Sequence, residues 1–253
     1  MKVYHSIAEW RAFRGSVPEF AGRRVGFVPT MGALHAGHRA LLERAAAEND
    51  HVVLSIFVNP TQFDNPTDLA LYPRTLETDL QLAGGLVHSV LAPAPEELYP
   101  DKYRYRVTEQ EFSRELEGAH RPGHFDGVLT VVLKLLNLVQ PHRAYFGEKD
   151  WQQLRLVHDM AAALFLPTEI VPCATVRDAD GLALSSRNRR LSPGGRAHAA
   201  IFPRLLAAST TAEQAAAALA TEGFGVDYVA DRDGVRLGAV RLENVRLIDN
   251  VRL

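Results

Sequence analysis

The sequence predicts an α/β protein in which a parallel sheet is covered by helices, followed by a smaller α+β domain. Short runs rich in β-branched and aromatic residues alternate with longer helical patterns up to about residue 176, an arrangement typical of parallel sheets. The chain then enters GLALSSRNRRLSPGGR, which is rich in turn formers and arginine. We therefore expect two domains, covering residues 1–176 and 177–253.

The expected elements follow from the apolar patterns of the chain. In the first domain, strands are expected over 23–29, 51–58, 86–93, 143–147 and 168–176, and helices near 37–48, 74–83, 126–139 and 150–164. The segment 126–139 is apolar nearly all round, so we expect this helix to be buried against the sheet or at a subunit contact. The second domain should contain helices over 195–207 and 211–220 and strands over 226–231, 239–244 and 245–250.

Composition and charge narrow the class of protein. The 253 residues are 47% hydrophobic and 23% charged, as is ordinary for soluble proteins. With 28 basic and 30 acidic residues, the chain as a whole has no electrostatic preference for nucleic acid or an anionic membrane. The N-terminus lacks the apolar stretch of a signal peptide, and no run approaches the ~20 apolar residues that span a bilayer. We expect a cytoplasmic protein without nucleic-acid or membrane partners.

The segment PTMGALHAGH, residues 29–38, is a strand end, a glycine turn and a helix start. Unpaired N–H groups and a partial positive charge at a helix N-terminus make such a unit an anion site. His35 and His38 are three residues apart, which places both imidazoles on one side of the first turn. Neutral imidazoles can donate hydrogen bonds to phosphate oxygens. Gly37 lets the backbone approach a neighbouring group closely.

Two other interpretations of these histidines stay open at this point. They could be metal ligands, although two are too few for a site and the spacing is not that of HExxH. They could also face solvent without a special role. The chain contains neither GxGxxG nor GxxxxGK[ST], so any nucleotide must be bound by a different loop.

Further polar groups follow other predicted strands. In SIFVNPTQF (55–63), Asn59, Pro60 and Gln62 stand at a strand's carboxyl end, where open α/β sheets bind ligands. An ordinary Asn-Pro turn is the alternative. In FGEKDWQQL (146–154), Lys149 opposes the dipole of the following helix unless an anion compensates it, which makes it a phosphate candidate. The alternative is a solvated turn.

The turn GLALSSRNRRL, residues 181–191, contains two serines and several arginines. Loops of this kind hold phosphates through backbone and hydroxyl donors, and Arg187 could add a bidentate guanidinium. A flexible linker with solubilising charge is the alternative.

Seven separated motifs resemble, in order and approximate spacing, the pantothenate synthetases (pantoate–β-alanine ligases). They are PTMGALHAGH, SIFVNPTQF, YPRTLETDL, EGAHRPGHFDGV, NLVQP, FGEKDWQQL and DGLALSSRNRRL. The resemblance runs from residue 24 to about 192 and returns in VRLIDN near the end. It implies a Rossmann-like first domain of the nucleotidyltransferase superfamily, in which HAGH (35–38) occupies the HIGH-type tetrad shared with class I aminoacyl-tRNA synthetases.

The resemblance also implies a reaction. (R)-Pantoate would condense with β-alanine while ATP is cleaved to AMP and pyrophosphate through a pantoyl-adenylate. Family members are typically cytosolic homodimers that need Mg²⁺. The second domain would be a lid that closes with ATP and keeps water from the intermediate.

Site residues carry over motif by motif. His38 would be the catalytic acid, with His35 and Lys149 also catalytic. The ATP-binding residues would be Met31, Gly32, Ala33, Leu34, His35, Ala36, Gly37, His38, Gly147, Glu148, Lys149, Asp150, Val176, Leu184, Ser185, Ser186 and Arg187. Gln62 would bind pantoate and β-alanine, and Gln153 pantoate. No protein side chain is assigned to the metal, and Arg121, His124 and Asp79 receive no role.

The residue types agree with this chemistry. A carboxylate that attacks the α-phosphorus of ATP must overcome like-charge repulsion, which cations around the phosphates relieve. Neutral amides such as Gln62 and Gln153 can orient pantoate without neutralising it, whereas a lysine there would weaken the nucleophile.

Rival functions remain. A nucleotidyltransferase for a phosphorylated acceptor should have basic residues where this chain has Gln62 and Gln153. A nucleotide-binding sensor could lose His38 or Lys149, yet both residues are present in this chain. An RNA-binding role is weaker still, given the net charge. The main departure from the family is the C-terminal domain, which we expect to be abbreviated after about residue 200.

Overall fold

The structure, a computed structural model, describes residues 1–16, 20 and 22–253 and divides into two compact units. The first unit comprises Met1–Leu34, His38–Gly147 and Gln152–Cys173. The second comprises Ala174–Leu253 together with two short pieces from the N-terminal half, His35–Gly37 and Glu148–Trp151. The units are therefore not two continuous halves of the sequence.

The first unit is built on a six-stranded sheet whose described strands all pair in parallel. The strand order is β1-β4-β3-β2-β5-β6. The strands are β1 (Lys2–Tyr4), β2 (Val25–Thr30), β3 (His51–Ile56), β4 (Ser89–Leu91), β5 (Arg143–Gly147) and β6 (Glu169–Cys173). The predicted parallel sheet and its five predicted strands are confirmed. β5 has the predicted bounds and β2 is displaced by one to two residues, whereas β3, β4 and β6 are shorter than predicted. Sequence reasoning missed β1, because three residues are too short to show a strand pattern.

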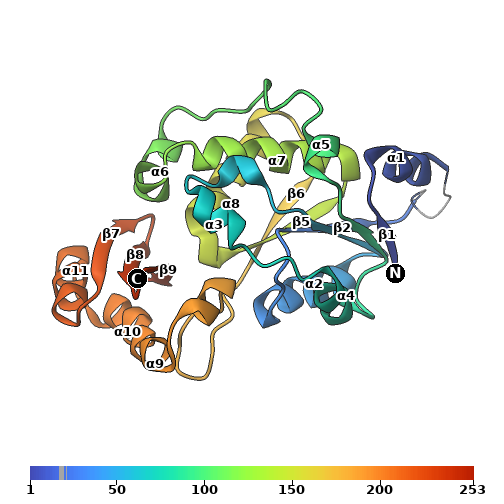
Figure 1. The fold of residues 1–253 in the computed structure, drawn as a ribbon. Helices are drawn as coiled ribbons and strands as arrows, with labels where there is room; N and C mark the ends of the chain where they lie inside the picture. The colour runs from blue at the N-terminus through green and yellow to red at the C-terminus, as the bar shows by residue number, and fades with distance from the viewer. Residues whose placement is uncertain (17–19, 21) are drawn as a thin grey trace. The chain divides into compact units, whose positions relative to one another are not determined.

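Helices cover both faces of this sheet (Figure 1). They are α1 (Ile7–Ser16), α2 (Ala36–Glu48), α3 (Pro66–Ala70), α4 (Leu76–Ala83), α5 (Pro95–Leu98), α6 (Leu116–His120), α7 (His124–Val139) and α8 (Trp151–Ala163), with 3₁₀ turns η2 (Pro60–Gln62), η3 (Phe112–Arg114) and η4 (Glu148–Asp150). Alternate strand residues face opposite cores. Phe27 and Val53 pack with α7 and α8, whereas Val28 and Leu54 pack with α2 and α4.

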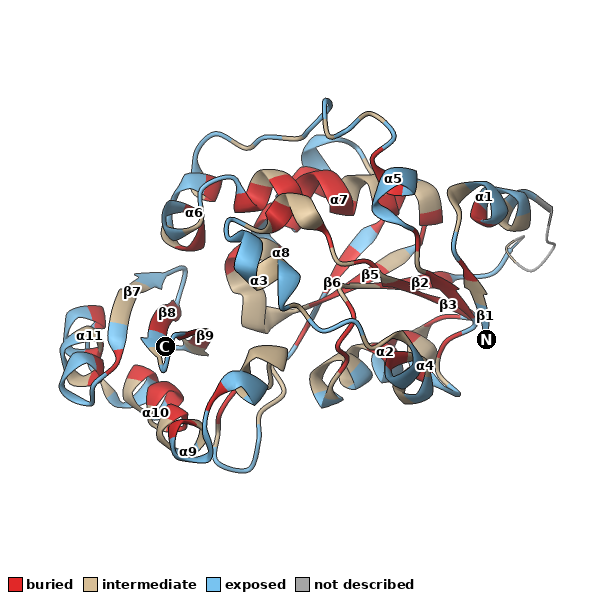
Figure 2. Cartoon of the chain, in the orientation of Figure 1, coloured by how far each residue is buried: buried red, intermediate tan, exposed pale blue. Residues whose placement is uncertain are grey.

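Helix α7 is buried against the sheet, as its apolar sequence predicts (Figure 2). It begins at His124, two residues before the predicted start. The ammonium group of Lys134, an exception in the apolar pattern, donates to the Leu98 carbonyl at 2.9 Å and lies 3.2 Å from an Asp101 carboxylate oxygen. The charged end of this side chain therefore finds partners while its stem stays in the core.

The second unit packs three helices on an antiparallel sheet. Its elements are η5 (Ser186–Arg190), α9 (Pro193–Ala199), α10 (Ile201–Ala208), α11 (Ala212–Thr221), β7 (Gly225–Arg232), β8 (Val235–Leu242) and β9 (Val245–Arg252), with strand order β7-β8-β9. Its separate core includes Phe202, Leu206, Leu219 and Leu247.

Two sequence predictions for this unit were wrong in detail. The helix predicted over 195–207 is two helices that meet at Ala200. Pro203 has no N–H to donate to the Ala199 carbonyl, so an unbroken helix would lose a hydrogen bond there and clash. The strand predicted over 239–244 begins earlier and ends at Leu242, because Glu243 and Asn244 have positive φ and form the hairpin turn.

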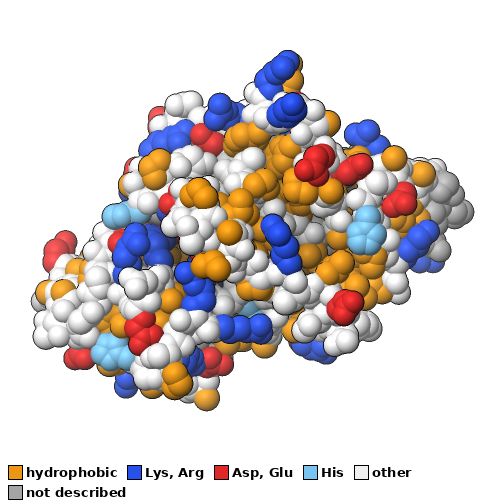
Figure 3. All heavy atoms as spheres, viewed as in Figure 1, with side chains coloured by type: hydrophobic (Ala, Val, Ile, Leu, Met, Phe, Trp, Pro, Cys, Tyr) orange, Lys and Arg blue, Asp and Glu red, His pale blue; other side chains and the backbone are white. Residues whose placement is uncertain are grey.

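Across the described part of the chain, no helix is long and apolar enough to cross a membrane. The face drawn in Figure 3 shows basic, acidic and hydrophobic side chains, with the basic ones more prominent than the acidic ones.

Candidate active site

The candidate site begins where the strand order of the sheet reverses. The chain runs outward from β2 to β3 and β4, then returns to β5, which pairs with β2 on its other side. Open α/β sheets bind ligands at the carboxyl ends of their strands at such a reversal. The predicted segments Met31–His38 and Gly147–Asp150 follow β2 and β5, the two strands that flank it.

The loop after β2 is held by Asp79, to which the sequence assigned no role. Its carboxylate is buried and accepts hydrogen bonds from the N–H groups of Ala33 (3.0 Å) and Leu34 (2.7 Å) and from the Thr75 hydroxyl (3.2 Å). Gly32 has φ of +80°, and a Cβ there would lie 3.0 Å from the Asp79 carboxylate. The N–H groups of Ala33 and Leu34 are therefore already hydrogen-bonded to Asp79. Any contact of these two residues with a phosphate would have to be made by their other atoms.

His35 is arranged as a neutral imidazole. The Gly37 N–H lies 3.1 Å from His35 Nδ1, which therefore accepts and leaves the ring proton on Nε2. The pKa of His35 is lowered to about 4, mainly by burial and then by the charges of Lys149 and Arg189, with Asp150 opposing. A Cβ on Gly37 would lie 2.9 Å from the His35 ring, so the glycine leaves room for the imidazole.

Lys149 lies in η4, between the end of β5 and the start of α8. Its side chain is mostly buried, and its ammonium nitrogen is 4.0 Å from an Asp150 carboxylate oxygen. Within the second unit, the positive charges of Lys149 and Arg189 both lower the pKa of His35, so the two cations lie in the neighbourhood of this imidazole. Sequence reasoning named Arg187 in the arginine-rich turn and missed Arg189, because three arginines in one turn cannot be ranked by spacing alone.

The turn 184–187 also belongs to the second unit. The Leu184 N–H donates to the Val176 carbonyl at 3.0 Å, which joins two predicted ATP-binding positions through the backbone. The Ser185 hydroxyl accepts from the Arg187 N–H at 3.2 Å and caps η5, which includes Ser186. Its hydroxyl hydrogen remains to donate. A Cβ on Gly37 would lie 3.9 Å from the Leu184 side chain, so the structure brings Gly37 and this turn together within the second unit.

In the first unit, hydrogen bonds determine whether the Gln62 side chain offers its amide oxygen or its amide nitrogen to a ligand. The Asn59 amide nitrogen donates to the Gly127 carbonyl at 3.2 Å, and Asn59 Oδ1 accepts from the Tyr99 hydroxyl at 2.7 Å and from Thr61 at 3.0 Å. A carbonyl can only accept, so this pattern fixes the orientation of Asn59. The same nitrogen donates to Gln62 Oε1 at 3.0 Å. Gln62 therefore accepts inward and keeps its N–H groups for a ligand.

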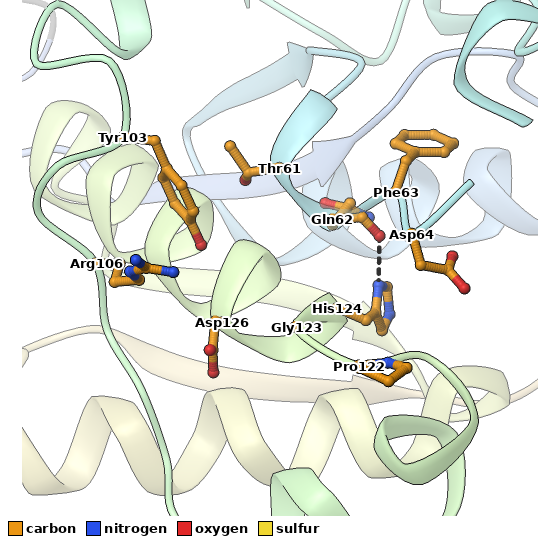
Figure 4. A pocket seen from close by; sticks show the side chains of 10 residues that line it. All are labelled: Thr61, Gln62, Phe63, Asp64, Tyr103, Arg106, Pro122, Gly123, His124 and Asp126. Atoms are coloured by element: carbon orange, nitrogen blue, oxygen red, sulfur yellow. Dashed lines mark hydrogen bonds between the residues drawn. The ribbon is translucent and has the colours of Figure 1, made fainter. Parts of the chain in front are cut away.

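The main chain of Gln62 is held by Arg121 and His124, which had no assigned role. His124 Nδ1 donates to the Gln62 carbonyl at 2.9 Å (Figure 4). Arg121 Nη2 donates to the same carbonyl at 3.3 Å. Arg121 Nη1 lies 3.1 Å from His124 Nε2, which accepts when the ring is neutral. The pocket beside them is lined by Thr61, Gln62, Phe63, Asp64, Tyr103, Arg106, Pro122, Gly123, His124 and Asp126.

The two neighbouring glutamines on α8 differ in their surroundings. Gln152 is buried, and its amide accepts from the Glu117 N–H at 3.0 Å and donates to the carbonyls of Phe112 (2.7 Å) and Glu115 (3.0 Å). Gln153 is half-buried. Successive helix residues point about 100° apart, so Gln153 is turned away from the partners of Gln152. Gln152 has a structural role, which leaves Gln153 as the ligand candidate.

The remaining assignments concern His38 and the metal. His38 is half-buried in the first turn of α2 and belongs to the first unit. Within the residues that the structure describes, no group of three or more His, Cys, Asp and Glu side chains could hold a metal ion.

Comparisons with known proteins point to one family. The family model described as pantoate-beta-alanine ligase matches residues 2–252. A pantothenate synthetase from Bdellovibrio bacteriovorus is 52% identical over 253 residues, covering 100% of this chain and 99% of that protein. A pantoate-beta-alanine ligase from Francisella tularensis, in a crystal structure with β,γ-ATP and β-alanine, is 39% identical with a TM-score of 0.94 and covers 100% of this chain and 97% of its own. The Thermus thermophilus enzyme is 45% identical with a TM-score of 0.90, covering 100% and 99%.

These relatives correct one expectation from the sequence. Because this chain spans 97% to 99% of their lengths, its C-terminal region is not abbreviated in comparison with them.

Proposed function

Because the chain belongs to the pantoate–β-alanine ligase family, we propose that it condenses (R)-pantoate with β-alanine at the expense of ATP. The observation that carries the proposal is that each unit contributes its own kind of side chain. In the second unit, the cations Lys149 and Arg189 lie close enough to the neutral imidazole of His35 to lower its pKa. Gln62, oriented by Asn59, offers a neutral amide.

In the first half-reaction, a carboxylate oxygen of pantoate attacks the α-phosphorus of ATP. The bond to the bridging oxygen of the β-phosphate breaks, pyrophosphate leaves, and pantoyl-adenylate remains. Negative charge shifts onto the leaving group, so the cations Lys149 and Arg187 are suited to stabilise it, with the imidazole of His35 proposed to assist. His38 is proposed to act as the catalytic acid.

Pantoate is proposed to be oriented by Gln62 and Gln153. The Gln62 N–H groups can donate to pantoate oxygens without neutralising the attacking carboxylate, because an amide carries no charge. Fixing Gln62 through Asn59 reduces the freedom lost when pantoate binds.

In the second half-reaction, the unprotonated amine of β-alanine attacks the acyl carbon of the mixed anhydride. The bond from the acyl carbon to the phosphate oxygen breaks, AMP leaves, and the amine loses a proton. Gln62 is proposed to contact β-alanine as well as pantoate.

Mg²⁺ is proposed to accompany ATP. This ion prefers oxygen ligands and is usually bound by substrate phosphates, waters and one or two carboxylates, and Asp150, beside Lys149, is a carboxylate of the right kind. When bound, the ion would neutralise phosphate charge. The proposal further includes a homodimer and a cytoplasmic location, which sedimentation and cell fractionation would test.

The decisive experiment is isotope exchange between pyrophosphate and ATP with pantoate present and β-alanine absent. Exchange that requires pantoate is expected, since the first half-reaction is reversible and does not involve β-alanine. Folded protein that binds ATP and gives no pantoate-dependent exchange would refute the proposal and favour an adenylyltransferase with another acceptor or a nucleotide sensor.

A further inference from the structure

The C-terminal strand β9 contacts the turn that contains Lys149. The side-chain nitrogen of Asn250 donates to the Glu148 carbonyl at 2.8 Å and to the Lys149 carbonyl at 3.0 Å. Asn250 is 9% exposed. Both N–H bonds of one buried amide are therefore used on two successive carbonyls of η4.

These two carbonyls are the ones that determine the direction of the Lys149 side chain. The Glu148 carbonyl belongs to the peptide plane before the Lys149 Cα, and the Lys149 carbonyl belongs to the plane after it. Peptide units are planar, so holding both planes restricts φ and ψ at Lys149 and thereby the direction of its Cα–Cβ bond. A long lysine side chain loses much rotational freedom when it binds a phosphate, and a fixed starting point reduces the volume it must search.

Asn250 is itself held in place by an ion pair. Arg177 donates to both carboxylate oxygens of Asp249, at 2.7 and 2.9 Å, and to the Asn250 carbonyl at 2.9 Å. Asp249 is 3% exposed and accepts from the Asn250 N–H at 2.7 Å. Arg177 also donates to the Gly181 carbonyl at 3.0 Å, within the loop that leads to the turn 184–187.

We infer that Asn250 is a positioning residue that aims Lys149 at the phosphates of ATP, supported by the Arg177–Asp249 ion pair. This assigns a role to the VRLIDN motif, which the proposed reaction leaves unused. The inference rests on the proposed function, because it needs Lys149 to bind phosphate. An aspartate at position 250 would have no donor for the two carbonyls and would place a carboxylate beside Asp249.

The test compares Asn250→Asp with Leu247→Val and Lys149→Ala. Leu247 is a buried core residue of the same strand and does not contact η4 through a side-chain hydrogen bond, so it is the matched control for general weakening of the second unit. The measurements are pantoate-dependent pyrophosphate exchange per folded molecule, KM for ATP and for pantoate, and the melting temperature.

Asn250→Asp is expected to lower kcat/KM for ATP by about tenfold or more, since small misplacements of a binding group are costly, and to change KM for pantoate less than about twofold. Leu247→Val should lower the melting temperature and leave exchange per folded molecule unchanged. The double variant Lys149→Ala with Asn250→Asp should exchange no more slowly than Lys149→Ala alone, because Asn250 acts through Lys149.

Several results would overturn the inference. Asn250→Asp with a lower melting temperature and wild-type kinetics would show a structural role only, and additive losses in the double variant would show that Asn250 acts independently of Lys149. If Lys149→Ala exchanges like wild type, Lys149 has no phosphate role and the inference fails with it. Failure of the proposed function is distinct, because wild-type protein would then show no pantoate-dependent exchange.

Discussion

Tyr99 and Tyr103 provide a matched pair of variants near Gln62. Burial raises the pKa of Tyr99 to about 12, so its hydroxyl stays protonated and donates to Asn59 at 2.7 Å. Tyr103 lies 5.6 Å away between ring centroids, and its buried hydroxyl has no hydrogen-bond partner among the described residues. We expect Tyr99→Phe to cost about 1 kcal/mol of unfolding free energy and to raise KM for pantoate, because Asn59 then holds Gln62 less firmly. Tyr103→Phe should change stability by less than about 0.5 kcal/mol.

Urea denaturation and initial-rate kinetics on both variants check this pair. Equal effects on stability and on KM for pantoate would contradict the proposed chain from Tyr99 through Asn59 to Gln62.

Gln62 allows the neutral-amide argument to be tested directly. In Gln62→Glu, the side chain keeps an oxygen that can accept from Asn59 but loses the donors and adds a negative charge beside the carboxylate of pantoate. Gln62→Ala loses the donors without adding charge. We therefore expect Gln62→Glu to reduce kcat/KM for pantoate more than Gln62→Ala does. The reverse ranking in pyrophosphate exchange would refute this model of the pantoate site.

Lys149→Ala and His38→Ala test the catalytic assignments. Removal of one group that stabilises developing charge commonly slows a reaction by about 10²–10³-fold, and we expect losses of that size in adenylation. Neither side chain is fully buried, so the fold should be retained, which circular dichroism and the melting temperature would verify. Wild-type rates in both variants would invalidate the assignments.

At the scale of elements, β3 and β4 contain a group that makes stability depend on pH. His51 on β3 is buried, lies 3.1 Å from the Ser89 hydroxyl on β4, and stacks on His88 with 4.8 Å between ring centroids. Its pKa is lowered to about 4, by burial first and then by His88, Arg23 and Arg14. The unfolded chain, with an ordinary histidine pKa near 6.5, binds a proton that the folded protein does not, so stability falls as the pH drops from about 6.5 towards 4.

We expect His51 to contribute a loss of the order of 2–3 kcal/mol over this range, with His35, whose pKa is also lowered to about 4, adding a loss of the same sign. Guanidinium denaturation at pH 7 and pH 5 measures the slope, and His51→Asn, which cannot titrate, should reduce it. The same slope in the variant and in wild type would exclude His51 as the cause.

Helices and strands with a clear pattern of apolar residues could be predicted from the sequence, whereas interactions between residues far apart in the sequence could not. The strands around Phe27 and Val53 and the apolar helix α7 were predictable because their residue patterns match their burial. The break at Ala200 depends on one residue, Pro203, in an otherwise helical pattern. Asp79 lies 46 residues from Ala33, and Asn250 lies 102 residues from Glu148, so no local pattern could show that they hold the two loops of the candidate site.

At the scale of the whole molecule, the second unit includes residues that the sequence places inside the first. Glu148–Trp151 belong to it, and the Asn250 amide holds two of their carbonyls, whereas the preceding strand β5 belongs to the first unit. Each unit has its own core, so the units should open with different free energies. A mutation that weakens a core should therefore lower the local stability of Glu148–Trp151 only when that core is the core of the second unit.

Hydrogen exchange resolved by residue tests this with two buried leucines. Leu219→Ala, in the core of the second unit, should speed amide exchange in β7–β9 and in Glu148–Trp151 while leaving β5 protected, because a buried Leu→Ala change costs about 2–5 kcal/mol locally. Leu42→Ala, in a core of the first unit, should do the reverse. If the amide exchange rates of Glu148–Trp151 change together with those of β5 in both variants, the local stability of the turn that contains Lys149 depends on its neighbours in sequence and not on strand β9.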